Sequence, residues 1–350
     1  MAINYAIKYA TKIAERFKKA SITADDCGNS YSWLNPNSRT IRIGSVNTVP
    51  ETQYTRSGSN RFGEVHDVGD TLQEMTCEQQ PAFSFTIDAL DQTDQAIQKS
   101  AGSALRRQLD EVTIPGMDKH RIKKWIMGAN IAVKETTAPT KATIGGLIID
   151  LNAKMTDALV PLEGRTLYIA TEYYKLLKQM PDYIGVDALG KEALAKGVVG
   201  EFDGCRVKPI PTSYMPAGVY FFIKHKGCTV DPVKLQKYNI LTEVQGYSGP
   251  VVQGVTYYDS FVLGAKGDGV AVCGNAAILA APTMSITGHA VSITAVSGVV
   301  FKYTTDGTNP RYSNTAQIYT AAVTLTAGQT MRAVGTKDGC VGIEGTKDYE

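Results

Sequence analysis

The clearest pattern in the chain is an alternation of apolar and polar residues in two stretches of its first quarter. One stretch covers residues 41–54 and the other covers residues 83–87. Alternation with a period of two is typical of β-strands that have one covered face. The polar residues 56–70 lie between the stretches, so we predict a long two-stranded ribbon with a polar tip. Because such a ribbon is only marginally stable in water, we expect it to lie on a neighbouring copy of the chain.

Apolar residues at helical spacing predict two helices near the ribbon. Residues 4–20 carry an aromatic or aliphatic side chain every four residues, with basic residues between them. A longer helix is predicted to begin at Asp91 or Thr93 and to continue with apolar residues at i, i+4 spacing. Pro115-Gly116 is expected to interrupt this helix, and its apolar face resumes until Gly128.

From about residue 140 the pattern predicts an α/β region, and from about residue 276 it predicts a separate β domain. The α/β region is expected to contain helices at 147–159 and 173–177 and strands at 166–170, 205–210, 219–223 and 255–263. Beyond residue 276, short alternating segments are separated by turns, which favours a small antiparallel sandwich. We therefore predict an α+β fold with a small all-β domain after it.

Length and composition add bounds to this picture. The 350 residues are 43% hydrophobic and 20% charged, as expected for a globular protein of two or three domains. No apolar run approaches the ~18 residues needed to cross a bilayer. The N-terminus has no signal-peptide order, so we expect a cytoplasmic protein without a membrane partner. Six scattered cysteines are expected to be reduced.

Charge is distributed unevenly along the chain. The formal net charge is +2, but residues 1–20 carry +4, residues 99–124 carry +4 and residues 46–90 carry −5. Opposite charges on separate segments favour head-to-tail pairing between copies, although any single residue can instead belong to a solvated face. The candidate intersubunit residues are Arg56, Arg61, Glu64, Asp67 and Asp70 in the ribbon and Arg106, Arg107, Lys123 and Lys124 in the long helix. Lys12, Arg16, Lys18 and Lys19 form a basic N-terminal arm.

The sequence offers no motif for catalysis, so we expect no enzyme, no cofactor and no metal site. The four histidines, His66, His120, His225 and His289, are isolated from one another. The glycines of residues 264–269 are spaced like a phosphate loop, but they follow a strand with no helix after them, which favours a turn.

The order of arm, ribbon, long helix and α/β body resembles the major capsid proteins of tailed bacteriophages, which have the Hong Kong 97-like fold. The likeness rests on residues 9–17, on residues 83–88 leading into 105–110, and on residues 164–174 and 204–227. It covers roughly residues 1–275. An encapsulin-like cellular nanocompartment, which would enclose a protein cargo, is the alternative with the same fold.

The resemblance implies five parts within residues 1–275. They are an N-terminal arm (1–40), an extended loop (41–90), a spine helix with the peripheral domain (91–139), an axial domain (140–254) and a return strand of the peripheral domain (255–275). It also implies an icosahedral shell of pentamers and hexamers that encloses double-stranded DNA, assembled in the host bacterial cytoplasm. A portal and a separate scaffolding protein are the further partners it implies, and the basic segments would meet DNA through phosphate charge alone.

Two details qualify the resemblance. Some family members join subunits through a lysine of the extended loop, but this chain has no lysine between Lys19 and Lys99, so we expect a non-covalent shell. Residues 301–310, Tyr319 and residues 330–334 resemble the small immunoglobulin-like domain of chitobiase-type hexosaminidases. That likeness implies an outer-surface domain at 276–350 that contacts glycans or only decorates the shell, and it leaves a carbohydrate-binding module protein as a second alternative.

Overall fold

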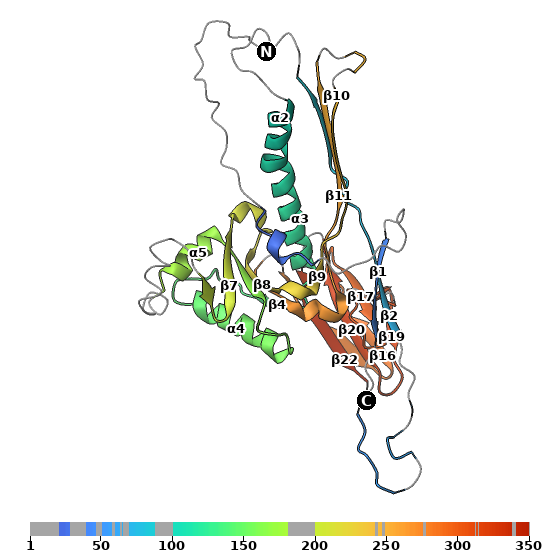
Figure 1. Ribbon diagram of the computed structural model, residues 1–350. Coiled ribbons are helices and arrows are strands. Elements are labelled where there is room, and N and C mark those ends of the chain that lie inside the picture. Colours follow the sequence, from blue (N-terminus) through green and yellow to red (C-terminus); the bar gives the residue numbers. More distant parts are fainter. Residues whose placement is uncertain are drawn as a thin grey trace.

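The computed structural model shows an α+β body from which a helix and a long sheet project in one direction and a narrow hairpin in the other (Figure 1). The structure describes residues 21–28, 40–46, 51–57, 60–63, 65, 70–87, 101–180, 200–241, 244–246, 249–275, 278–311, 313, 315–337 and 341–349. The predicted helix at 4–20, the start of the long helix at 91 or 93 and the basic arm lie outside these residues.

A six-stranded mixed sheet forms the centre of the body. Its strands lie in the order β4–β13–β8–β5–β7–β6, with parallel pairing of β13 with β4 and of β5 with β7. The strands are β4 (Ile131–Lys134), β5 (Arg165–Ala170), β6 (Glu201–Phe202), β7 (Cys205–Ile210), β8 (Val219–His225) and β13 (Val270–Gly274). Every residue of β5 and β13 is buried, because both faces of the sheet are covered.

Helices cover the two faces of this sheet. Alternate residues of the strands point to opposite sides, so Tyr168 and Phe222 pack against one group of helical side chains and Leu167 and Phe221 against another. Helix α3 (Ile114–Met127) covers the first face, and α4 (Ile144–Asp157) with α5 (Thr171–Lys178) covers the second. The predicted α/β region is confirmed in these elements.

The long helix is continuous where an interruption was expected. Helix α2 (Ala101–Gln108) passes through a π-helical turn, η2 (Leu109–Thr113), directly into α3. Pro115 lies just after the π turn, and the wider π turn accommodates the proline ring and the hydrogen bond that its missing N–H cannot make. The prediction of a break at Pro115-Gly116 was therefore wrong.

A second correction concerns the ribbon. Its first strand, β1 (Thr40–Val46), pairs with β2 (Asp70–Thr76), so the returning arm is β2 and not residues 83–87. Residues Ala82–Thr86 form β3, which pairs with β11 (Val251–Tyr258). The phenylalanines of β3 alternate as predicted, but only the tertiary structure selects their partner strand.

The strand β11 also pairs with β10 (Val233–Leu241), and the three strands form a long sheet beside α2 in the order β10–β11–β3 (Figure 1). The hairpin of β10 and β11 was not predicted. The sequence placed the end of the axial domain at residue 254 and the start of the return strand at residue 255. Both residues lie inside β11, so this strand is continuous across the expected boundary.

Short elements complete the body. They are the 3-10 turns η1 (Ala24–Asp26), η3 (Thr212–Tyr214), η4 (Lys226–Cys228) and η5 (Gly264–Gly269), and the strand pair β9 (Thr229–Val230) and β12 (Phe261–Val262). The glycines of η5 lead into strand β13 and not into a helix, as the turn prediction required. No helix of the described residues has the length and apolar character that a membrane span requires.

The C-terminal residues form a β-sandwich, as predicted. One sheet has the order β15–β16–β19 and the other β18–β17–β20–β22, and Phe301, Leu325 and Met331 lie between them. The strands are β15 (Met284–Thr287), β16 (Ala290–Ile293), β17 (Val300–Thr304), β18 (Gln317–Ile318), β19 (Val323–Thr324), β20 (Thr330–Thr336) and β22 (Glu344–Asp348). The short strands β14 (Ile278–Leu279) and β21 (Val341–Gly342) pair in parallel where the sandwich meets the body.

Candidate assembly surface

Helix α3 contacts two segments from the first quarter of the chain, residues 21–28 and the base of the ribbon. The segment 21–28, which follows the basic arm in sequence, lies against α3 and the six-stranded sheet. The base of the ribbon contacts the body through Glu78, Met75 and Cys77. Both contacts are made by buried carboxylates, Asp118 and Asp259, which are 2% and 1% exposed.

Asp118 of α3 holds the beginning of the arm segment. Its carboxylate accepts hydrogen bonds from Ser21 Oγ at 2.7 Å, from the backbone N–H of Ile22 at 2.9 Å and from Thr23 Oγ1 at 2.6 Å. Arg121, one turn further along the helix, lies 4.0 Å from the same carboxylate and donates to Thr23 Oγ1 at 3.3 Å. A buried carboxylate needs such partners, and here nearly all of them come from the arm segment.

Asp26 fixes the end of η1 to the sheet. Its Oδ2 accepts hydrogen bonds from Tyr168 Oη at 2.5 Å and from Lys208 Nζ at 2.7 Å. Lys224, which is fully buried, donates to the Asp26 carbonyl oxygen at 2.5 Å and lies 4.3 Å from the centre of a Trp125 ring. The carboxylate and carbonyl of Asp26 and the aromatic face of Trp125 therefore offset the cost of burying the two lysines.

Asp231 continues this network towards residue 28. It accepts hydrogen bonds from the Trp125 indole N–H at 3.1 Å, from the Gly28 N–H at 3.1 Å and from Ser260 Oγ at 2.5 Å. The backbone N–H of Asp231 in turn donates to the Gly28 carbonyl at 3.0 Å. A β-carbon on Gly28 would lie 1.7 Å from the Thr229 carbonyl oxygen, so only glycine fits this close approach.

Asp259 ties the base of the ribbon to α3. One carboxylate oxygen lies 2.8 Å from His120 Nε2, and the other accepts the backbone N–H of Glu78 at 2.9 Å. Next to this contact, Ile41, Met75 and Cys77 are buried against Tyr257 of β11. The base of the ribbon therefore packs against its own body. The expectation that the ribbon lies on a neighbouring copy now applies only to the residues beyond this base.

The pKa values of the Asp26 and Asp259 carboxyls are lowered. Burial raises the pKa of Asp26, but hydrogen bonds from Lys208 and Tyr168 and the charges of Lys208 and Lys224 outweigh it, and the net pKa is below the ordinary value. Burial also raises the pKa of Asp259, and hydrogen bonds from His120, Glu78 and Ser260 outweigh it. Both groups are therefore anionic at neutral pH and hold their partners by charge-assisted hydrogen bonds.

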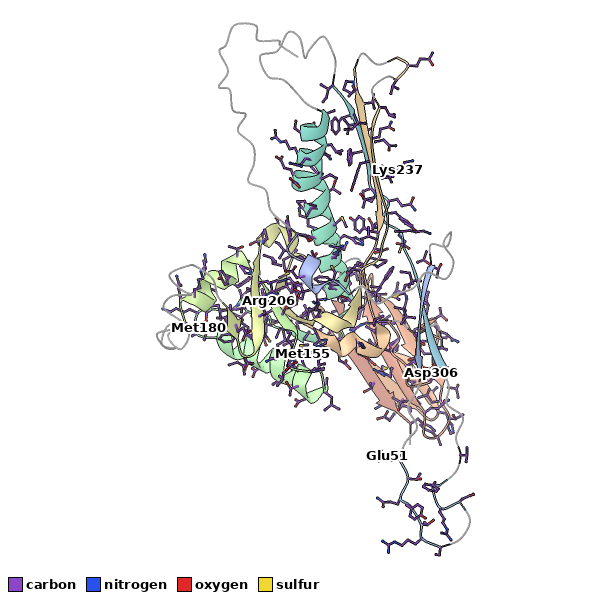
Figure 2. All side chains as sticks on the ribbon, in the orientation of Figure 1. Glu51, Met155, Met180, Arg206, Lys237 and Asp306 are labelled. Atoms are coloured by element: carbon purple, nitrogen blue, oxygen red, sulfur yellow. The ribbon has the colours of Figure 1, made fainter. Side chains whose placement is uncertain are left out.

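The described part of the ribbon tip is a small ordered turn with exposed aromatic rings. The Thr55 N–H donates to the Arg61 carbonyl at 3.0 Å, and Thr52 Oγ1 donates to the Phe62 carbonyl at 2.9 Å. The rings of Tyr54 and Phe62 meet edge to face at 5.1 Å. Tyr54, Phe62 and Val65 are 52%, 84% and 98% exposed, and Figure 2 shows the labelled Glu51 well clear of the body.

The predicted charged residues do not form one patch. Arg56 and Arg61 are exposed on the ribbon tip, and Asp70 begins β2 opposite Val46. Arg106 and Arg107 are exposed on α2, where Arg107 forms an ion pair of 2.7 Å with Glu111. Lys123 and Lys124 are about 25 Å further along the helix at 1.5 Å per residue.

Lys123 is exposed, and Lys124 lies 4.0 Å from Asp259. The remaining predicted residues, Glu64, Asp67, Lys12, Arg16, Lys18 and Lys19, lie outside the described part of the chain. The pairing of the −5 ribbon with a +4 segment of a neighbour therefore stays a prediction.

Sequence reasoning missed the buried carboxylates. Asp118 and Asp259 stand among basic or apolar residues, and nothing in their spacing distinguishes them from surface acids. Their common signal is a carboxylate inside an otherwise apolar pattern. Asp118 lies on the apolar face of α3, and Asp259 directly follows the apolar strand β11. Such a position predicts a buried acid that needs partners, but it does not identify them.

Four of the five described cysteines are buried, and Cys27 is half-buried. Cys27, Cys77, Cys205, Cys228 and Cys273 are free thiols. Burial raises the pKa of Cys77 and Cys273 to about 12 and that of Cys205 and Cys228 to about 11. Among the described residues, no group of three or more histidine, cysteine or acidic side chains is arranged to hold a metal ion.

Comparisons with known proteins agree with this architecture. The family model described as Fn3 associated matches residues 291–343, within the C-terminal sandwich. A structure from Mycobacterium phage Che8 superposes with a TM-score of 0.64 at 16% identity and covers 77% of this chain and 97% of that chain. No curated protein sequence matches the chain.

Two further similar structures are of phage capsids. The capsid structure of the cyanophage P-SCSP1u has a TM-score of 0.61 at 14% identity, with 78% of this chain and 93% of that chain covered. The mature capsid of bacteriophage PhiM1 has a TM-score of 0.60 at 14% identity, with coverages of 77% and 92%. With its ribbon, long helix, central sheet and added sandwich, the chain has the α+β, Hong Kong 97-like fold of phage capsid subunits, followed by an immunoglobulin-like domain.

Proposed function

We propose that the protein is the major capsid protein of a tailed bacteriophage, which assembles with itself into an icosahedral shell of pentamers and hexamers around double-stranded DNA. The observation that supports this most strongly is the fold likeness, which spans 92% or more of three phage structures. The projecting parts support it independently. A hairpin and a helix-backed sheet that leave the body in opposite directions expose surface that an isolated molecule does not use.

The site geometry fits a subunit whose ribbon is held firmly at its base and projects beyond it. The buried carboxylates Asp118 and Asp259 fix the first described residues and the ribbon base, while the ribbon tip stays exposed. This arrangement fixes residues 21–28 and the base of the ribbon on the body. Neighbouring copies would then supply the surface on which the arms lie.

A single preparation tests the proposal. The full chain, expressed alone and with the neighbouring genes of its source genome, is expected to form closed shells of uniform size in negative-stain electron microscopy. Shells isolated from infected or induced host cells are expected to contain double-stranded DNA protected from nuclease. Particles that enclose a protein cargo instead would favour the nanocompartment alternative, and a chain that stays monomeric under every condition would refute the proposal.

Portal, scaffolding protein and DNA are the partners that this function requires, and we propose them on that ground alone. Contact with DNA is proposed for the basic arm residues Lys12, Arg16, Lys18 and Lys19, through phosphate charge and without sequence preference. The immunoglobulin-like domain is proposed to lie on the outer surface of the shell.

A further inference from the structure

A cleft lies where the ribbon base, the end of α3 and the C-terminal domain meet, and its volume is about 460 Å³. Strand β2 forms one wall, and the last turn of α3 forms the floor. The opposite wall is formed by β17 and β20, in which Lys302 and Val334 are directly paired and both line the cleft. A volume of this size falls within the range of ~300–1,000 Å³ that small-molecule sites occupy.

Much of the cleft lining is apolar. The side chains of Met75, Met127, Phe261, Val262 and Val334 contribute to it. Met75, Val262 and Val334 are 5%, 3% and 1% exposed, so they form the inner surface of the cleft. A ligand with an apolar body would remove this surface from water, which favours its binding.

Two lysines of the C-terminal domain give the cleft its positive charge. Lys302 is half-buried and Lys337 is exposed, and neither forms a hydrogen bond or an ion pair with another described residue. None of the described residues that line the cleft is acidic. The two ammonium groups are therefore available to an anion that enters the cleft.

Lys124 and Arg311 also line the cleft, but both are engaged within the chain. Lys124 lies 4.0 Å from Asp259, and Arg311 donates to the carbonyls of Ala129 and Gly342. The Ala129 carbonyl lies just beyond the last turn of α3, where the helix dipole places partial negative charge. Arg311 offsets this negative charge, which would otherwise repel an anion in the cleft.

We propose that the cleft binds a small organic anion with an apolar body, such as an aryl or alkyl sulfonate, carboxylate or phosphate. The apolar body would lie on Met75, Phe261 and Val334, and the anionic group would face Lys302 and Lys337. An inorganic anion would leave the apolar lining uncovered, and a neutral ligand would bury part of Lys302 without giving it a partner. The lining therefore selects a ligand that combines the two properties.

A ligand at this position would contact all three parts of the chain that form the cleft. It would hold the ribbon base against the C-terminal domain, and it would stabilise this arrangement because the unfolded chain has no such site. The cleft is complete within one chain. The inference therefore goes beyond the proposed shell function and does not depend on it.

Isothermal titration calorimetry of the purified full chain tests the site, with naphthalenesulfonate as the probe. The native chain is expected to bind the probe saturably at one site. The double variant Lys302→Gln, Lys337→Gln is expected to bind it at least about tenfold more weakly, because both ammonium groups are lost. The matched control is Lys141→Gln, Lys154→Gln, which removes two exposed lysines outside the cleft and is expected to bind like the native chain.

Two further probes separate the charge of the ligand from its apolar body. Naphthalenemethanol, which is neutral, and sulfate, which has no apolar body, are each expected to bind the native chain at least about tenfold more weakly than naphthalenesulfonate. This comparison decides the question even where circular dichroism shows that the double variant is unfolded.

The proposal is overturned if the native chain shows no saturable binding of naphthalenesulfonate, or if a folded double variant binds it as tightly as the native chain. Equal binding of naphthalenesulfonate and naphthalenemethanol would overturn it as well. Shell formation is measured separately by electron microscopy, so each of these results leaves the shell function standing.

Discussion

At the scale of single residues, the fold depends on a few buried acids that bring distant parts of the chain together. Asp118 and Asp26 hold the segment 21–28, and Asp259 holds the base of the ribbon. Each carboxylate is nearly inaccessible and is saturated by hydrogen bonds, so removing it leaves buried donors without partners. These residues therefore contribute more to stability than their number suggests.

The first prediction concerns Asp118. Asp118→Ala removes the acceptor of Ser21, Ile22 and Thr23 and leaves Arg121 buried beside it. We expect the free energy of unfolding to fall by about 3 kcal/mol and segment 21–28 to become open to proteolysis. Denaturant titration of unassembled subunits and limited proteolysis measure the two effects. Asp150→Ala, at an exposed position of α4, is expected to change stability by less than about 0.5 kcal/mol.

The second prediction concerns pH. Because the pKa of Asp26 lies below its ordinary value of 3.8, its contribution is complete above that pH and is lost as the pH falls through the lowered pKa. Asp26→Asn removes this contribution. The difference in unfolding free energy between the native chain and the variant is expected to be constant from neutral pH to about pH 5 and to shrink below pH 3.8. A difference that persists undiminished at about pH 2.5 would contradict the assignment.

At the scale of elements, the long sheet beside the spine helix depends on one glycine. Gly254 of β11 lies between Phe83 of β3 and Tyr238 of β10, whose rings stack across it with centres 6.2 Å apart. A β-carbon there would lie 2.4 Å from Phe83 and 2.7 Å from Tyr238, so the rings would have to move apart. Because Gly254 has no side chain, the two rings can contact each other across the central strand.

The third prediction follows from this packing. Gly254→Val is expected to lower the free energy of unfolding by about 2 kcal/mol and to speed hydrogen exchange in β3 and β10, because the two rings lose their contact. Gly44 is a suitable control, since it also lies in a strand but a β-carbon there meets nothing within 4 Å. Equal effects of Gly44→Val and Gly254→Val would show that strand glycine alone, without the stacked rings, accounts for the loss.

At the scale of the whole molecule, the C-terminal domain is part of the body and not a loosely attached module. Arg311 Nη1 donates to the carbonyl of Ala129 and, at 2.8 Å, to Asn130 Oδ1, and its Nη2 donates to the Gly342 carbonyl. Asn309 also donates to Asn130 Oδ1, at 2.5 Å. Val334 is 1% exposed on the sheet face that meets the body. This junction places the cleft and the ribbon base side by side.

The fourth prediction tests the junction. Arg311 lies in the loop before β18 and donates hydrogen bonds to the end of α3 and to β21. Arg311→Ala removes three of these hydrogen bonds. Hydrogen exchange is expected to rise at least about tenfold in β14 and β21, while the strand β16 inside the sandwich stays protected. Mass spectrometry of peptides from the intact chain measures both. Increased exchange in β16 would show that the sandwich itself unfolds.

The fifth prediction concerns shell formation. Reversing charge with Glu64→Lys, Asp67→Lys and Asp70→Lys is expected to reduce the yield of shells at least about tenfold, while circular dichroism shows a folded subunit, because like charges would face the neighbour. The neutral variant Glu64→Gln, Asp67→Asn and Asp70→Asn is expected to give a shell yield between those of the native chain and the charge-reversed variant. Normal shells from the reversed variant would refute pairing of the ribbon with a basic surface.

How far the sequence predicts the fold differs between local and distant features. The strand and helix periodicities at residues 144–178 and 205–225 predicted elements that the structure confirms within a few positions. The sandwich was predicted from its turn spacing, and its place at residues 276–350 agrees with the observed strands. These features depend on neighbours along the chain, which the sequence displays directly.

The prediction of the ribbon shows where this reasoning stops. Three segments contain apolar residues in patterns compatible with a strand, namely 41–46, 70–76 and 83–87. Periodicity alone does not show which two of these segments pair. The structure pairs β1 with β2 and gives β3 to β11, about 170 residues away in sequence. The candidate charged residues were identified individually, but their spread along α2, α3 and the ribbon became visible only in three dimensions.

By itself, then, the sequence determined the local elements, the α+β class and the order of parts that resembles a capsid subunit, because these follow from short-range patterns of apolar and polar residues. Only the tertiary structure decided the partner of each strand, the buried carboxylates that anchor the arms and the cleft between the domains. The physical reason is that strand pairing, burial of charge and docking of domains are long-range choices, settled by which surfaces of the folded chain fit together.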